Sequence, residues 1–515
     1  MTSDDVVELV NRSLSLDAET PFRERVAEQA EGLRDQLADG RFDNADFAVG
    51  LELECYAVDA TADTPHLARV PDSVFQSAGV NKELGLHNVE VNTDASRMDE
   101  RGLAQQASEI RARIGAARAG ASEVGQELVL DAMFAVPPRS GTEAYVGAVE
   151  NRDGLVFAEN MRQDPRYVAI DNDTLRHTEG DSITLDVPGT TVDFPTILFE
   201  SLATSIQPHL QVPEASAFPA YYNAAIRTMG PLLALSSNSP FLPADLYGDV
   251  ADPEAVVEST HHELRIDVFE QSVNATPNPK VRVPRDIEDT EGVLDRLLAD
   301  DLYAPFLREW IEGDDPRESL SDRIWELDHK RGTYWRWLRA VVGGDRVDAD
   351  NDEYSLRIEY RPLPTQPTVT DIVGLQALTA GLVRGLVDAG HPITELPWSA
   401  AEASFYEAVE DGLDADLAWI TTDGERTGDS ATIFEEVFDY AHRGLEAAGI
   451  ADAEIDRYLD PIQARWSARL TPSTWKKSRV REALAEGADL ETAIERMQTR
   501  YINRSLESDS FADWL

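Results

Sequence analysis

Two glutamates stand two residues apart in the apolar stretch FAVGLELEC, residues 47–55. Side chains alternate between the two faces of a β-strand, so Glu52 and Glu54 would share one face while the leucines and Cys55 fill the other. Like charges side by side on a strand repel, and carboxylates are rarely buried without partners. The pattern therefore raises the question of what holds these carboxylates on their shared face.

Four further stretches show the same alternation of polar and apolar residues. In each of them the polar side chains would share one face of a strand. They are Asn88, Glu90 and Asn92 in HNVEVNT; Gln207, His209 and Gln211 in IQPHLQV; Arg357, Glu359 and Arg361 in LRIEYRP; and His261, Glu263, Arg265 and Asp267 in HHELRIDV. We expect one face of one sheet to carry carboxylates, a histidine and arginines.

This polar face has two interpretations. A solvent-exposed sheet face alternates in the same way, and for any single strand that is the simpler reading. The mixed row around Glu359 would neutralise itself, but Glu52, Glu54 and Glu90 have no basic neighbours in their strands. Carboxylates together with His209 are suitable ligands for Mg²⁺, and nearby arginines would neutralise a transferred phosphoryl group. The residues alone thus indicate a metal–phosphate site.

Several common site motifs are absent from the sequence. It contains no GxxxxGK[ST] phosphate loop, no GxGxxG after a strand, no HExxH and no paired CxxC. Nucleotide sites of those types and a structural or hydrolytic zinc site are therefore not expected. The single cysteine, Cys55, falls on the apolar face of its strand, so we expect a buried structural thiol and not a nucleophile.

The composition is that of a strongly acidic protein. Of 515 residues, 96 are Asp or Glu and 46 are Lys or Arg, which gives a formal net charge of −50. Such a charge repels nucleic acids and anionic lipids, so neither is expected as a partner. Dispersed acids and scarce lysine are typical of a halophilic protein in a salt-loaded cytoplasm. An acidic N-terminus and the lack of an apolar run of about 18 residues predict a cytoplasmic location without a membrane span.

The order of the expected elements indicates an α+β fold in three regions. Residues 1–45 predict a helical segment, with a helix from Pro21 to Gly40; 46–375 predict a catalytic α+β domain; and 376–515 predict a helical region packed on it. Strands are expected at FAVGLELECYAV, HNVEVNT, ELVLDAMFAV, SITLDV, SIQPHLQV, ELRIDVFEQ and YSLRIEYRPLP, and helices at 102–121 and 218–237. No glycine-rich turn joins a strand to a helix, so an antiparallel or mixed sheet with helices on one side is favoured over a doubly wound sheet.

Two other stretches have both a structural and a functional interpretation. ALSSNSPFLP, residues 234–243, joins a helix to a loop of hydroxyl and amide groups that includes Asn238, and a capped helix end before a proline turn is as good a reading as a binding loop. HKRGTYWRWLRAVV, residues 329–342, interleaves tryptophans with arginines that could hold a nucleotide base or phosphate. A partly buried amphipathic helix is the simpler interpretation of that stretch.

Taken together, these stretches resemble the glutamate–cysteine ligase family, in its carboxylate–amine ligase branch. VGLELE is similar to the family's G-x-E-x-E strand, VEVNT to its next acidic strand, PHLQV to its H-x-H strand and LLALSSNSPF to its most recognisable loop. RIDVFEQSV and LRIEYRPLPTQPT resemble the later strands that bring arginine and a further metal-binding glutamate, and TPSTWKKSRVREAL is a weaker match. Six motifs follow in order from about residue 47 to 370, which makes the resemblance specific.

The resemblance implies a fold, an activity and a site. The fold is glutamine synthetase-like, a curved, mainly antiparallel sheet with helices on its outer side, whose concave face binds ATP and Mg²⁺. The activity is ATP-dependent phosphorylation of the γ-carboxylate of glutamate, followed by attack of an amine such as cysteine to give γ-glutamylcysteine, as in glutathione biosynthesis. The metal ligands would be Glu52, Glu54, Glu90, His209 and Glu359; the catalytic arginines Arg265 and Arg361; and the groups for ATP or substrate Asn92, Gln211, Asn238 and Arg357.

The sequence also departs from the family pattern. Gln211 stands where the family's H-x-H strand has its second histidine, so this position either supplies a neutral amide ligand or serves the substrate. Nothing in the sequence recognises a thiol or indicates an oligomeric state. There are two functional alternatives: a γ-glutamyl ligase with another amine acceptor, and a non-catalytic protein that binds ATP or a metabolite. The structural alternative is that the acidic face is a halophilic surface without a specific site.

Overall fold

A nine-stranded sheet forms the centre of the computed structural model, which describes residues 3–61, 64–178, 182–275, 278–313, 319–343 and 354–515. The main path of the sheet runs β12-β13-β11-β1-β4-β3, and the pairings between these described strands are antiparallel. The strands are β1 (Ala48–Asp59), β3 (Val80–Lys82), β4 (Asn88–Asn92), β11 (Ile206–Gln211), β12 (Leu338–Val342) and β13 (Leu356–Tyr360); β2 (His66–Leu67), β5 (Ser96–Arg97) and β6 (Gln126–Val129) also pair with β1. The predicted α+β class with a mainly antiparallel sheet is confirmed.

Strand β1 divides its side chains as the alternation predicts. Val49, Leu51, Leu53 and Cys55 are buried, whereas Glu52 and Glu54 on the other face are partly accessible. Burial raises the pKa of the Cys55 thiol to about 12, because the thiolate would lose its hydration. The prediction of a buried structural thiol is therefore confirmed.

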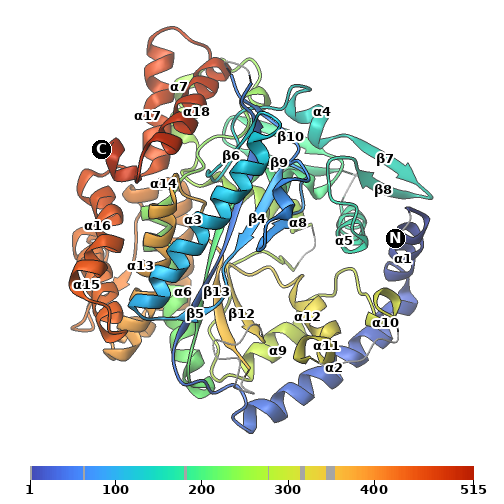
Figure 1. Cartoon of the computed structure of the whole chain (residues 1–515), viewed down its shortest axis with the longest axis vertical. Helices are drawn as coiled ribbons and strands as arrows, with labels where there is room; N and C mark the ends of the chain where they lie inside the picture. Colours follow the sequence, from blue (N-terminus) through green and yellow to red (C-terminus); the bar gives the residue numbers. More distant parts are fainter. Residues whose placement is uncertain (1–2, 62–63, 179–181, 276–277, 314–318, 344–353) are drawn as a thin grey trace.

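Long helices pack together on one side of the sheet (Figure 1). They are α3 (Glu100–Ser122), α6 (Phe218–Ser236), α13 (Val369–Asp388), α14 (Trp398–Asp411), α15 (Ser430–Ala447) and α16 (Asp452–Ala468). Helices α13 and α15 approach so closely that a Cβ on Gly385 would lie 1.8 Å from the carbonyl oxygen of Tyr440, so only glycine fits there. Helix α13 is long and apolar enough to cross a membrane, but 83% of its most apolar window is buried inside the protein.

The last two helices, α17 (Pro472–Ala485) and α18 (Leu490–Glu507), are both tied to Asp131, α17 by a buried ion pair and α18 by a hydrogen bond from Gln498 Nε2 at 2.6 Å. Lys476 Nζ lies 2.5 Å from Asp131, and in the preceding helix Arg465 Nη2 lies 2.7 Å from Asp371. The three-region division stays a prediction; its second boundary, between residues 375 and 376, falls inside α13.

The N-terminal helices α1 (Ser3–Ser13) and α2 (Leu16–Ala38) lie along the lower right of Figure 1, where α1 contacts α5 (Pro165–Leu175) and α2 contacts α12 (Trp325–Arg331). Helix α2 begins five residues before the Pro21 start that the sequence predicts. Asp17 and Glu19 in its first turn interact favourably with the helix dipole, which supports the earlier start.

Two expected elements are wrong in type. The stretch ELRIDVFEQ is a helix, α8 (Leu264–Val273), because Leu264, Val268 and Ser272 follow each other at four-residue spacing and are all buried. The stretch 329–342 is not one helix: α12 ends at Arg331, and the chain then enters strand β12. Short apolar–polar alternations fit both the helical and the strand period, so only the packing decides between a helix and a strand.

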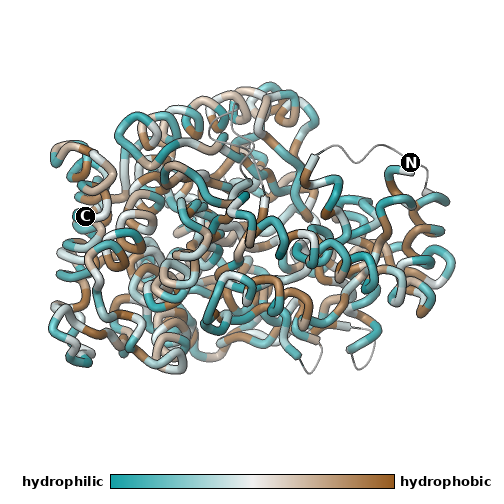
Figure 2. Tube along the Cα trace, turned by 90° about the horizontal axis from the view of Figure 1, so that it is seen from below, coloured by the Kyte–Doolittle hydropathy of each residue, from teal (hydrophilic) through white to brown (hydrophobic). Residues whose placement is uncertain are grey.

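Two expected strands differ in extent or partner. ELVLDAMFAV forms a strand over only its first residues, as β6, and SITLDV forms β9 (Ile183–Val187), which pairs with β10 (Thr190–Phe194) outside the main sheet. The remaining described elements are α4 (Thr142–Val146), β7 (Val149–Arg152), β8 (Leu155–Ala158), α7 (Pro253–Ser259), α9 (Gly292–Ala299), α10 (Arg308–Ile311), α11 (Leu320–Arg323), β14 (Trp419–Ile420) and β15 (Arg426–Thr427). Figure 2 shows hydrophilic and hydrophobic positions interspersed along most helices, in keeping with the dispersed acids.

Candidate active site

The sheet register brings the predicted polar residues together on one face. Residues directly opposite each other on neighbouring strands project to the same side. Glu54 lies opposite Glu90, Glu52 opposite both Asn92 and Gln207, His209 opposite Glu359, Gln211 opposite Arg357, and Arg339 on β12 opposite Glu359. This face is therefore a continuous row of carboxylates, amides, one histidine and arginines from β4 to β12.

Two cavities open over this face and meet at Glu52, which lines both of them. The larger, of about 1040 Å³ including its open mouth, is lined by acids and arginines together with an apolar wall that includes Phe269 and Trp335. The smaller, of about 740 Å³, is lined by Asn92, Gln211 and other residues at the opposite ends of the same strands. Because Glu52 lines both cavities, the two volumes are adjacent at this side chain.

An acidic cluster of Glu54, Glu83 and Glu90 lies in the larger cavity, with one carboxylate oxygen of each within 4.8 Å of the others. Glu54 accepts hydrogen bonds from the Ser205 amide at 2.7 Å and from Gln207 Nε2 at 3.1 Å. Within the described ranges, no ion pair joins these three glutamates to a basic side chain. Three oxygen donors so close together and without a directly paired cation fit a hard cation such as Mg²⁺, although the charges of Arg361 and Arg265 act on Glu54 from further away.

The protonation equilibria of the cluster show the same unbalanced charge. Burial, followed by the charges of Glu52 and Glu54, raises the pKa of Glu90 to about 7. Burial and the charges of Glu90 and Glu54 raise the pKa of Glu83 well above its usual range, and burial also raises that of Glu54. A bound cation would relieve this repulsion and favour the ionised carboxylates.

Glu359 has a different environment from the cluster. Arg339 donates to both of its oxygens at 2.8 Å, and Arg361 Nη1 donates to Oε1 at 2.8 Å. Burial alone would raise the pKa of Glu359, but the charges of Arg339 and Arg361 outweigh burial and hold it far below the usual range. Its predicted role as a metal ligand would require at least one of these hydrogen bonds to be replaced.

His209 lines the smaller cavity and contacts Glu52, which lines both cavities. Arg357 Nε donates to His209 Nδ1 at 2.9 Å, so the neutral imidazole carries its proton on Nε2, which faces Glu52 Oε1 at 3.3 Å. Burial would raise the pKa of Glu52, but its interaction with the His209 ring lowers it. In this arrangement His209 supports Glu52, and its predicted role as a metal ligand would require the proton to leave Nε2.

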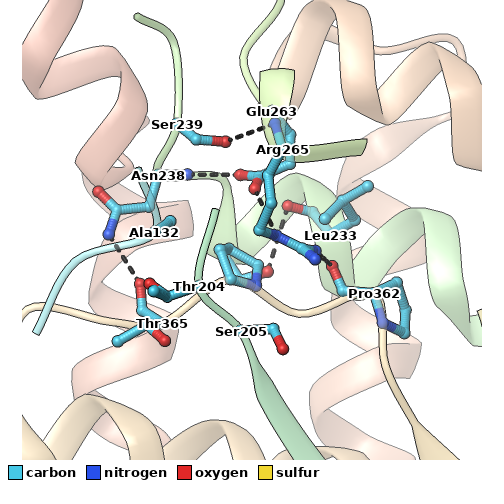
Figure 3. A network of polar contacts seen from close by, with 12 residues as sticks. Ala132, Thr204, Ser205, Leu233, Asn238, Ser239, Glu263, Arg265, Pro362 and Thr365 are labelled. Carbon is cyan, nitrogen blue, oxygen red and sulfur yellow. Dashed lines mark hydrogen bonds and ion pairs between the residues drawn. The ribbon is translucent and has the colours of Figure 1, made fainter. Parts of the chain in front are cut away.

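Two predicted site residues, Arg265 and Asn238, line neither cavity. Figure 3 shows the network of polar contacts that they form with Glu263. Arg265 Nε donates to Glu263 Oε1 at 3.1 Å and its Nη2 donates to the carbonyl of Pro362, with the side chain almost fully buried. The Asn238 amide donates to Glu263 Oε2 at 2.8 Å, and its Nδ2 donates to the Thr365 carbonyl at 2.8 Å. This network fixes the loop around Asn238 to the chain that follows β13. The roles that the sequence predicted for Arg265 and Asn238 stay predictions, and the charge of Arg265 acts to lower the pKa of Glu54.

The smaller cavity collects the remaining predicted residues. Asn92, Gln211 and Arg357 line it, and Gln211 Nε2 donates to the Asp46 carbonyl at 3.4 Å. Gln211 is thus away from the acidic cluster, on the side of Glu52 that carries amides, hydroxyls and a guanidinium.

Sequence reasoning missed several residues that line the larger cavity, and among them are Glu83, Arg166, Glu200 and Arg339. Glu83 and Glu200 lie outside regular strands, and Arg166 lies in a helix, so alternation could not place them on the sheet face. Only Arg339 had a sequence signal, as one of the arginines between the tryptophans of residues 329–342.

Comparison with known families gives one match across most of the chain. The family described as glutamate-cysteine ligase family 2 matches residues 48–500. No curated protein matches the chain.

Solved structures give a fold relationship at low sequence identity. Glutamate–cysteine ligase from Francisella tularensis, solved in complex with AMP, aligns with a TM-score of 0.50 at 13% identity over 91% of this chain and 90% of that one. A bifunctional glutathione synthetase from Pasteurella multocida aligns with a TM-score of 0.49 at 13% identity, over 93% of this chain and 55% of that one.

Proposed function

Because the chain belongs to glutamate-cysteine ligase family 2 and is an ATP-dependent ligase that forms C–N bonds, we propose that it joins the γ-carboxylate of glutamate to cysteine. The product would be γ-glutamylcysteine, formed through a γ-glutamyl phosphate intermediate. The observation that carries this proposal is the unpaired cluster of Glu54, Glu83 and Glu90 beside Arg361 in one cavity.

Glu54, Glu83 and Glu90 would hold Mg²⁺, since they offer oxygen ligands with no competing basic partner among the described residues. Bound magnesium would neutralise the phosphate oxygens of ATP. Glu52 would complete the acidic side of the site, because it lies between the cluster and the smaller cavity.

The arginines of the sheet face would stabilise the charge that moves during the reaction. An oxygen of the glutamate γ-carboxylate attacks the γ-phosphorus of ATP and ADP leaves; the amine then attacks the acyl carbon and phosphate leaves. Arg361 and Arg339 line the cavity where negative charge collects in both steps, and Glu359 holds their guanidinium groups in place. The apolar wall with Phe269 and Trp335 would limit water, which would otherwise hydrolyse the acyl phosphate.

We assign the nucleotide to the smaller cavity. Its lining offers amide groups from Asn92 and Gln211, hydroxyls from Thr93 and Ser355, and the guanidinium of Arg357, which together suit a base, a ribose and phosphates. In this position the γ-phosphate would point across Glu52 toward the larger cavity. Gln211 would then serve the nucleotide and not the metal.

The experiment that tests the function measures ADP release with Mg²⁺, ATP and L-glutamate, adding cysteine, other amino acids and small amines in turn. Product mass is determined in parallel, and molar KCl is included because a net charge of −50 favours a screened medium. We expect cysteine-dependent ADP release and γ-glutamylcysteine, and no turnover with Glu54→Gln. Turnover with a different amine would identify that amine as the acceptor in place of cysteine. ATP binding without turnover on any amine would support a non-catalytic binding protein.

The acidic surface and the buried position of α13 support a cytoplasmic protein whose partners are small molecules and neither nucleic acid nor membrane.

A further inference from the structure

Two oppositely charged side chains of the larger cavity have no partner within the described part of the chain. One is the guanidinium of Arg166 on α5, and the other is the carboxylate of Glu200 in the short helix Ile197–Leu202. Neither forms a side-chain hydrogen bond or an ion pair with another described residue, and neither pairs with the other. In a chain with 96 acidic residues, an unpaired arginine in a protein cavity calls for an explanation.

Arg166 is held in place but not neutralised. Its Nε atom is buried without a hydrogen-bond acceptor, and the guanidinium lies against Gly332, where an added Cβ would be 1.9 Å from Nη2. Burial lowers the pKa of Arg166, and the charges of Arg339 and Arg331 add to this effect, while Tyr167 and Asp328 offset part of it. The glycine leaves room for a guanidinium that lies among other arginines. Such a group of positive charges is expected where an anion binds.

Glu200 shows the complementary situation. It lines the cavity together with the apolar residues Ile197, Phe269 and Val273. Burial and the charge of Glu54 raise its pKa to about 8, and the charges of Arg361 and Arg265 offset this only in part. A cationic or hydrogen-bond-donating group from outside the chain would satisfy this carboxylate.

We propose that Arg166 and Glu200 bind the α-carboxylate and the α-amino group of an amino-acid substrate. Apart from the acidic cluster assigned to the metal, the cavity presents Arg166 and Glu200, which have no partner among the described residues and do not pair with each other. Such a pair of opposite groups is complementary to a zwitterion and not to a simple amine or a phosphate. Phosphate in particular would be repelled by Glu200, and it has Arg361 and Arg339 at the sheet face. The inference rests on the proposed function, because glutamate and cysteine are the two amino acids that could supply these groups.

The test measures equilibrium binding by calorimetry, without ATP or Mg²⁺, so that it does not depend on turnover. The ligands are L-glutamate and L-cysteine, each paired with analogues that lack one α-group: glutarate and isoglutamine for glutamate, and cysteamine for cysteine. The variants are Arg166→Gln and Glu200→Gln, with Arg166→Lys as a conservative replacement in case the glutamine variant does not fold. Arg111→Gln, an exposed change on α3, is the control.

We expect Arg166→Gln to weaken binding of one intact amino acid at least tenfold while binding of its analogue without the α-carboxylate is unchanged. Glu200→Gln should likewise weaken binding of the intact amino acid at least tenfold, while binding of its analogue without the α-amino group is unchanged. Selective loss for glutamate places the donor in this subsite, and selective loss for cysteine places the acceptor there. Equal losses for amino acids and analogues, unchanged affinities, or no binding of either amino acid to the unaltered protein would overturn the inference. Selective binding without turnover in the assay above would overturn the proposed function alone.

Discussion

Replacing Glu90 by glutamine should stabilise the protein without metal and weaken its response to Mg²⁺. Glu90 is one of three glutamates whose oxygens lie within 4.8 Å of one another, and burial with the charges of Glu52 and Glu54 raises its pKa to about 7. Glutamine keeps the shape and the acceptor oxygen for the Asn92 amide, which lies 2.9 Å from Glu90. The substitution therefore removes the charge and little else.

The magnitude follows from the pKa difference between the folded and unfolded states. A shift from 4.5 to about 7 corresponds to about 3 kcal/mol at pH 8, where Glu90 is ionised in both states. Because the folded pKa is raised, this penalty is fully present above about pH 7, declines as pH falls, and is absent below about pH 4.5. For 515 residues, 3 kcal/mol corresponds to a rise in Tm of about 3 °C.

Thermal unfolding of the protein and of Glu90→Gln checks this expectation at pH 8 and pH 5, with EDTA and with Mg²⁺. With EDTA at pH 8 the variant should unfold at the higher temperature, and the difference should shrink at pH 5. A metal at 100 times its Kd should stabilise the unaltered protein by about 2.7 kcal/mol and the variant by less. The control Glu159→Gln, at an exposed position, should leave Tm unchanged. A variant that is less stable than the protein in EDTA at pH 8, or equally stabilised by Mg²⁺, would refute the charge-repulsion argument.

Two further predictions concern groups outside the cavity. Lys476→Met leaves the carboxylate of Asp131 buried without its cation, so it should lower the free energy of unfolding by about 3–5 kcal/mol in a denaturant titration. In the same titration, loss of the exposed Arg443 should change the free energy of unfolding by under about 1 kcal/mol. A small effect of Lys476→Met would show that α17 is held by apolar packing alone. Cys55 should not react with a thiol reagent in the folded protein at pH 8, because burial raises its pKa to about 12, and it should react in full after denaturation. Rapid labelling of the native protein would contradict the buried position.

Sequence periodicity predicted the centre of the sheet and half of the site. The alternation in β1 was sufficient to place Glu52 and Glu54 on one face, because a strand with one buried face has its register fixed. The strand prediction failed at α8, because its short polar–apolar repeats also have helical spacing. In addition, the buried Arg265 interrupts the apolar face of this helix. The sequence therefore predicted the strands that carry ligands better than the elements that support them.

The rest of the site was out of reach of local patterns for a physical reason. Glu83, Arg166 and Glu200 reach the cavity from a loop, a helix and a short helical turn, and their positions depend on contacts far apart in the sequence. No local propensity distinguishes an acid that faces a cavity from one that faces solvent.

The central claim is that the glutamate γ-carboxylate is phosphorylated before the amine attacks. It can be tested with glutamate labelled with ¹⁸O in the γ-carboxylate, Mg²⁺, unlabelled ATP and the accepted amine, by mass analysis of the released phosphate. In the proposed reaction one carboxylate oxygen becomes the bridge to phosphorus and leaves with phosphate, so each phosphate should carry one ¹⁸O. Phosphate released during amide formation without ¹⁸O would contradict the account, because the carboxylate would then not have been activated through that bond.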